Sequence, residues 1–93
     1  MEKELTILHL VLTFKWFDKI ASGAKTTEYR ECSEHWNKRF ENNHYNLVRF
    51  QRGYYKERPA NMIFEVKSIK KWHGANDLNL PTVWAIELGE RIE

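Results

Sequence analysis

The stretch FDKIASGAKTTEYR, residues 17–30, contains the end of a helix, a sharp stop and the start of a strand. Phe17, Ile20 and Ala21 are spaced i, i+3 and i+4, which places them on one inward face of a helix. Gly23 is a natural residue for the position after a helix, because glycine adopts the left-handed backbone conformation without strain. The stretch therefore predicts a helix that stops at this glycine and a strand that follows it.

The predicted strand over 26–30 carries the charged residues of greatest functional interest. Side chains alternate along a strand, so Glu28 and Arg30 share one face. Lys25 can join them only from the turn after the glycine. An acid held between two bases stays ionised and oriented, while the bases keep donors for a phosphate or a carbonyl group. These three residues are therefore a candidate site; the alternative is a surface ion pair that steadies a strand edge.

The rest of the chain predicts further strands and one more short helix. The first strand is apolar on both faces, which suggests burial on both sides. Thr13 and Ser33 can cap the two helices. The pattern of the longest strand slips so that Ile69 and Trp72 face inward, as at a bulge. The predicted helices cover 14–22 and 33–40, and the predicted strands cover 6–12, 26–30, 45–52, 62–72 and 82–88. Loops are expected around Pro59 and over 73–77.

Five strands with little helix predict an α+β fold, a small closed or nearly closed β-barrel. A chain of 93 residues has room for a single domain, 1–93. Cys32 is the one cysteine, which rules out an internal disulfide and favours a reducing compartment. The apolar run over 5–14 lacks a basic leader and is too short to cross a bilayer. We therefore expect a cytoplasmic protein without a membrane partner.

The middle of the chain is basic. Residues 49–72 carry seven basic and two acidic side chains, a local charge of +5, with aromatic residues between them. This pattern suits a phosphate backbone and stacked bases, although a solvated hairpin face or burial of the tryptophans would also explain it. The residues expected to add ligand contacts are Arg52, Tyr54, Lys70, Lys71, Trp72 and, outside this region, Trp36.

Metal and cysteine chemistry is not expected. Cys32 and His35 form a Cys-x-x-His pair, but the other histidines lack ligand spacing, and a structural zinc site needs four ligands. A Cys–His nucleophile would need an orienting partner, which the sequence does not identify. The sequence therefore predicts neither a metal nor a cofactor.

Residues 17–30 resemble the signature of the ASCH family, an amphipathic helix followed by G-x-K-x-x-E-x-R. Gly23, Lys25, Glu28 and Arg30 fill its four named positions. The later segments of the chain are also similar to the strands of that family, over 48–54, 62–69 and 83–88. The resemblance therefore covers nearly the whole chain.

This resemblance implies a PUA-like barrel with a cleft beside the signature that binds RNA or a nucleotide. Some small bacterial members are amidohydrolases that deacylate N4-acetylcytidine, and at least one other is a ribonuclease. Their catalytic lysine corresponds to Lys25 and their catalytic threonine to Glu28, which Thr27 precedes. Their catalytic glutamate lies in an insertion where residues 73–81 hold only Asp77.

The first expectation is therefore an RNA- or nucleotide-binding domain. The alternative is a hydrolase of a modified nucleoside or of RNA, in which Lys25 and Glu28 are catalytic. A third possibility is a protein-interaction module that leaves the cleft unused. Oligomeric state stays open.

Overall fold

The computed structural model describes residues 6–54 and 60–93, so the loop expected around Pro59 lies outside the described residues. All of the predicted helices and strands are present, with ends that shift by a few residues. Their bounds are β1 Ile7–Leu12, α1 Phe14–Ala21, β2 Thr27–Glu31, α2 Glu34–Asn42, β3 Leu47–Arg52, β4 Asn61–Trp72 and β5 Val83–Arg91.

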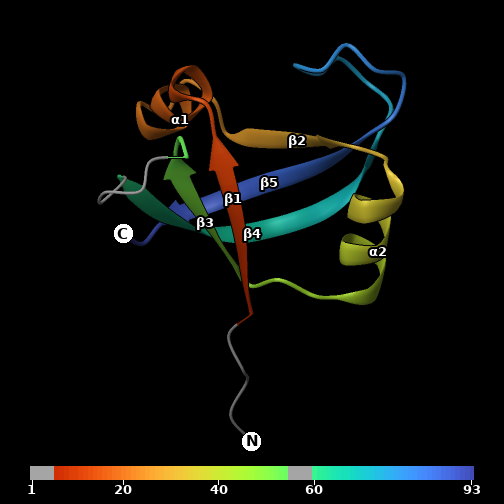
Figure 1. The fold of residues 1–93 in the computed structure, drawn as a ribbon, viewed down its shortest axis with the longest axis horizontal. Coiled ribbons are helices and arrows are strands. Elements are labelled where there is room, and N and C mark those ends of the chain that lie inside the picture. The colour runs from red at the N-terminus through yellow and green to blue at the C-terminus, as the bar shows by residue number, and fades with distance from the viewer. Residues whose placement is uncertain (1–5, 55–59) are drawn as a thin grey trace, which may run out of the picture.

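The five strands form one sheet in the order β1-β3-β4-β5-β2 (Figure 1). β1 pairs in parallel with β3, and the other neighbours pair antiparallel. The sheet curls into a half barrel, which confirms the α+β class and a small barrel-like architecture. β1 and β2 are the two edges of this sheet, and helix α1 links the end of one to the start of the other (Figure 1).

β4 contains the irregularity that its sequence pattern predicts. Its register against β5 shifts between Phe64 and Val66 and again between Val66 and Ser68. Ile69 is half-buried and packs against the core, as expected. The inward placement of Trp72 is wrong, since this residue is 42% exposed. The strand is ending there, and its indole Nε1 donates to the Ala75 carbonyl of the following turn (3.0 Å).

The core lies on the concave face of the sheet. It joins buried aliphatic and aromatic residues from every strand except β2 and from both helices. On β1, Leu8, Leu10 and Leu12 are buried, whereas Ile7 and His9 on the other face are exposed. The expectation of two-sided burial for this strand is wrong, because its second face is the outside of the half barrel.

The two helices close the concave side through a few large residues. α1 buries Phe17 and Ile20, but Ala21 is exposed, so the predicted inner face is narrower than the spacing suggests. In α2, Ser33 caps the helix by accepting from the Trp36 amide (3.3 Å), as predicted. Phe40 is buried against the core. None of the described helices is long and apolar enough to cross a membrane.

Candidate functional site

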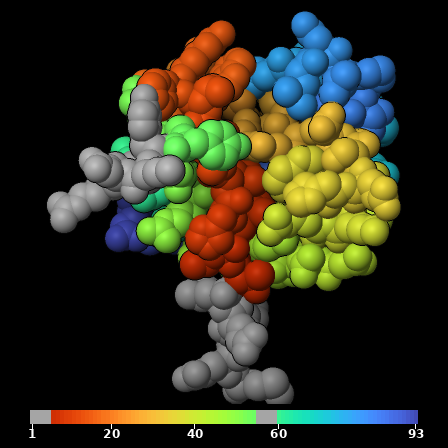
Figure 2. All heavy atoms as spheres, in the orientation of Figure 1, coloured from red at the N-terminus to blue at the C-terminus, as the bar shows by residue number. Residues whose placement is uncertain are grey.

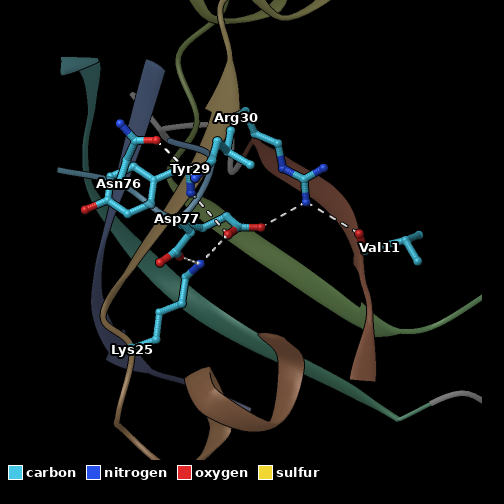
Figure 3. Close-up of polar contacts among 8 residues, drawn as sticks. Val11, Lys25, Tyr29, Arg30, Asn76 and Asp77 are labelled. Atoms are coloured by element: carbon cyan, nitrogen blue, oxygen red, sulfur yellow. Dashed lines mark hydrogen bonds and ion pairs between the residues drawn. The ribbon is translucent and has the colours of Figure 1, made fainter. Parts of the chain in front are cut away.

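The three charged residues of the signature converge, and Glu28 is their centre. Figure 3 shows the charged ends of Lys25 and Arg30 directed toward the same region. Lys25 Nζ lies 3.0 Å from Glu28 Oε1, and Arg30 Nη2 lies 3.0 Å from Glu28 Oε2. The Tyr29 amide also donates to Oε1 (3.1 Å). Glu28 is only 5% exposed and is the one buried charged residue in the described chain. Three donors therefore hold a carboxylate that water hardly reaches.

The local sequence explains this convergence. Gly23 has a φ of +85°, which ends α1 in the left-handed conformation. The Lys25 amide then donates to the Lys19 carbonyl (3.1 Å), which folds the turn back on the helix. As predicted, the lysine reaches the acid from this turn, while Glu28 and Arg30 alternate along β2 onto its inner face.

A fourth charged residue completes the cluster from a distant part of the chain. Asp77 Oδ2 accepts a hydrogen bond from Lys25 Nζ (Figure 3), so the ammonium lies between two carboxylates. The side chain of Lys25 is 9% exposed, and that of Asp77 is 32% exposed. Sequence reasoning noted Asp77 but did not place it in the site. Its signal was modest: it is the one acid in the loop over 73–81.

Asn76 organises the loop that presents Asp77. Its Oδ1 accepts from the amides of Leu78 (3.0 Å) and Leu80 (3.3 Å). Its Nδ2 donates to the carbonyls of Gly74 and Leu80, both at 2.9 Å. One amide side chain thus bonds to both sides of the loop and fixes the acid beside Lys25.

The charged cluster forms part of the wall of a pocket of about 390 Å³. This pocket lies at the seam where the two edge strands of the half barrel approach each other, and Arg30 Nη2 donates across the seam to the Val11 carbonyl (3.4 Å). Figure 2 shows the contributing segments meeting on one face: β1 in red, β2 in gold and the loop over 73–81 in light blue. The lining consists of residues 11–13, 28–31, Trp16, Lys25, Trp36, Asp77, Leu78 and Leu80.

Two tryptophans lie beside the two cations of the cluster. Lys25 Nζ is 4.3 Å from the centroid of the Trp16 ring, and Arg30 Cζ is 5.3 Å from that of Trp36. Cation–π attraction therefore helps to hold both charged ends in place. Trp36 lines the pocket as expected, whereas Trp16 was not singled out from the sequence. The signal in the sequence that could have identified Trp16 is the Lys-Trp-x-x-Lys spacing over 15–19, which brings two lysines to its ring.

Arg30 keeps unused hydrogen-bonding capacity. Its Nη2 donates to Glu28 and Val11, but its Nε is buried without a hydrogen-bond partner in the described chain. An unsatisfied buried donor destabilises a protein. An acceptor that enters the pocket and shifts the guanidinium would give Arg30 Nε the hydrogen bond that it lacks.

Five of the residues expected to add contacts lie outside the main pocket. Arg52 donates to both carboxylate oxygens of Asp18 (2.9 and 3.0 Å), and Tyr54 is 86% exposed. Lys70 and Trp72 line a separate hollow of about 200 Å³ together with the residues of β2 that point away from Glu28. Lys71 Nζ lies 5.6 Å from the centroid of the Trp84 ring. Strand alternation places Lys70 and Trp72 on the face of the sheet opposite Glu28, and sequence spacing did not show which face they occupy.

The Arg52–Asp18 pair anchors α1 to the end of β3. The hydrogen bonds and the charge of the guanidinium hold the pKa of Asp18 below its ordinary value. Arg52 also lies over the ring of Phe14 (4.1 Å). None of these three residues lines the main pocket, so Arg52 acts there only through the helix that carries Trp16.

The described residues contain no group of three or more histidine, cysteine, aspartate or glutamate side chains that could hold a metal ion. No protein-family model and no curated protein matches this chain. The chemistry of the site must therefore be inferred from its geometry: two cations as donors, one half-buried carboxylate as acceptor, and two indoles for flat apolar surface.

Proposed function

We propose that this protein is an RNA- or nucleotide-binding domain that receives one nucleoside in the pocket at the seam. The observation that supports this most is the position of the charged cluster in the pocket wall, with Trp16 on one side and Trp36 on the other. The pocket volume of about 390 Å³ falls within the range of small-molecule sites.

Each part of the pocket suits one part of a nucleoside. Lys25 and Arg30 are donors for base carbonyl or phosphate oxygens. Asp77 can accept from an exocyclic amine or a ribose hydroxyl, because its side chain is partly exposed. The two indoles line the pocket and give it aromatic walls against which a base can pack. Glu28, already engaged by three donors, holds the cations in position and leaves ligand contact to them.

The same arrangement supports membership of the ASCH family and a PUA-like fold. The glycine of the signature ends the helix with a positive φ, and its lysine, glutamate and arginine form one connected cluster. A cytoplasmic location is part of the same proposal, and the free thiol of Cys32 is in keeping with it.

Calorimetric titration with nucleosides and nucleotides tests the binding proposal. Arg30→Gln should lower affinity between about tenfold and a hundredfold, the range for loss of a charged hydrogen bond. Arg49→Gln, which removes an exposed arginine from the outer face of β3, is the matched control and should bind normally. Circular dichroism establishes that each variant is folded. Failure of the wild-type protein to bind any nucleoside, nucleotide or short RNA would reject the proposal.

The contact between Asp77 and Lys25 favours a second candidate, removal of the acetyl group from N4-acetylcytidine. Asp77 would take a proton from water as the water oxygen attacks the acetyl carbon. The Lys25 ammonium would donate to the carbonyl oxygen, where negative charge develops. The C–N bond then breaks, the amine nitrogen receives the proton, and acetate leaves.

Incubation with N4-acetylcytidine and with short single-stranded RNA, followed by mass-resolved chromatography, separates the two candidates. For an enzyme, Lys25→Met abolishes turnover, and Asp77→Asn lowers kcat while it preserves part of the affinity. Intact substrates together with measurable binding would reject hydrolysis and leave recognition as the function.

A further inference from the structure

Three lysines gather around a single tryptophan at the entrance of the site. The Nζ atoms of Lys15, Lys19 and Lys25 lie 4.8, 5.2 and 4.3 Å from the centroid of the Trp16 ring. The first two belong to α1 at positions i and i+4, where like charges destabilise a helix. This concentration of positive charge has an energetic cost in the free protein.

Carboxylates compensate only part of this charge. Lys25 is paired with Glu28 and Asp77. In the part of the chain that the structure describes, Lys15 and Lys19 have no carboxylate within ion-pair distance. The ammonium groups of Lys15 and Lys19 therefore leave positive charge beside Trp16 uncompensated, while that of Lys25 is already oriented by its two carboxylates.

A second hollow, of about 260 Å³, lies beside this cluster. It shares Trp16, Lys25, Tyr29 and Asp77 with the main pocket, so the two spaces are adjacent. The residues that the second hollow has in addition to those shared with the main pocket are Lys19, Ala24, Thr26 and Thr27, of which all but Ala24 carry a side-chain hydrogen-bond donor. Ammonium and hydroxyl donors are the groups that bind phosphate oxygens.

We propose that the second hollow is a phosphate subsite. It would take the phosphate of a nucleotide whose base occupies the main pocket, or the corresponding phosphate of an RNA strand. The inference rests on the proposed function and extends it from a nucleoside to a phosphorylated ligand. Asp77 is the acid that faces this hollow, and a phosphate would compete with it for Lys25. Lys19 and the two threonines supply donors that this competition does not affect.

The affinity difference between a nucleoside and its phosphate measures the subsite. Cytidine, cytidine 5′-monophosphate and a tetranucleotide without terminal phosphates are titrated into wild type, Lys19→Met and Lys67→Met. Lys67 is an exposed lysine of β4, so its variant matches the change in charge away from the hollow.

We expect Lys19→Met to leave cytidine affinity unchanged and to lower nucleotide affinity about fivefold to tenfold. The same variant should reduce the slope of log affinity against log salt for the tetranucleotide by about one. Loss only with the monophosphate identifies a free nucleotide, and loss with the tetranucleotide identifies an RNA backbone. Cytidine that binds as tightly as its monophosphate would overturn the phosphate subsite while the nucleoside pocket stands.

A second measurement tests the subsite even if no nucleoside binds. Inorganic pyrophosphate is titrated while the indole NH resonance of Trp16 is followed by NMR. A saturable shift that disappears in Lys19→Met and persists in Lys67→Met supports the phosphate subsite. The absence of such a shift in the wild-type protein overturns it.

Discussion

Glu28 is the residue on which the geometry of the site depends. Its two oxygens accept from Lys25, Arg30 and the Tyr29 amide, and the side chain is almost fully buried. A buried charge of this kind is tolerated only while its partners remain in place. The same bonds hold the two cations in the pocket wall, so one carboxylate both stabilises this part of the fold and sets the geometry of the proposed binding site.

Glu28→Gln should lower the free energy of unfolding by about 3 kcal/mol, because two partly buried cations lose the counter-charge that they share. Urea denaturation followed by tryptophan fluorescence measures this change. Glu34→Gln is the control: it removes an acid from the exposed pair with Lys38 and should cost no more than about 0.5 kcal/mol. Equal losses in the two variants would contradict a central role for Glu28.

Asp18 makes stability depend on pH at the acidic end. The guanidinium of Arg52 lowers the pKa of Asp18 in the folded protein, so this pair stabilises the fold above the unfolded pKa of about 3.9. The contribution is lost as pH falls through the lower, folded pKa. The stability difference between wild type and Asp18→Asn should therefore be present at neutral pH and disappear in stronger acid. Denaturation curves across this range measure it, and a difference that grows on acidification would contradict the pair.

At the scale of elements, the turn between α1 and β2 sets the position of Lys25. Gly23 has a φ of +85°, and a Cβ there would meet no atom within 4 Å. The backbone conformation, rather than a lack of space for a side chain, therefore restricts which residues position 23 tolerates.

Gly23→Ala should cost about 1 kcal/mol of stability, because alanine is strained in the left-handed region. Gly23→Asn is the matched variant and should cost less, since asparagine tolerates that region better. Thermal denaturation of wild type and the two variants measures their order of stability. Equal stability of the alanine variant and wild type would show that the turn does not need the positive φ.

Element types were predictable because their signals are local. The spacing of Phe17 and Ile20, the stop at Gly23 and the slip in the pattern of β4 each lie within one segment, and the structure confirms all of them. The convergence of the signature charges also follows from local alternation plus one turn. The pairing of Lys25 with Asp77 joins positions 52 residues apart and depends on the path of the loop around Asn76. No local pattern encodes that path.

Across the whole molecule, the pocket lies between the two least supported strands. β3, β4 and β5 each have a hydrogen-bonded strand on both sides, whereas β1 and β2 each have one strand neighbour in the described sheet. Edge strands open at lower free energy than central ones. The walls of the site therefore belong to the more mobile part of the sheet.

Native-state hydrogen exchange should show this difference. In the free protein, the amides of β4 should exchange at least about tenfold more slowly than those of β1 and β2. A nucleotide bound at the seam should slow exchange in both edge strands and leave β4 unchanged. Uniform protection of all five strands, or ligand protection confined to β4, would contradict a binding site at the seam.

The strand order also sets a sequence of assembly. β3, β4 and β5 are consecutive in the chain and pair with their immediate successors, while β1 skips over β2 to reach β3, and β2 reaches β5 only across two intervening strands. Distant pairings cost more loop-closure entropy than local ones, so the central hairpins are favoured to form first. Under the proposed function, ligand binding would therefore require complete folding. A molecule in which the hairpins have formed but either edge strand is undocked has a sheet and lacks the ligand pocket.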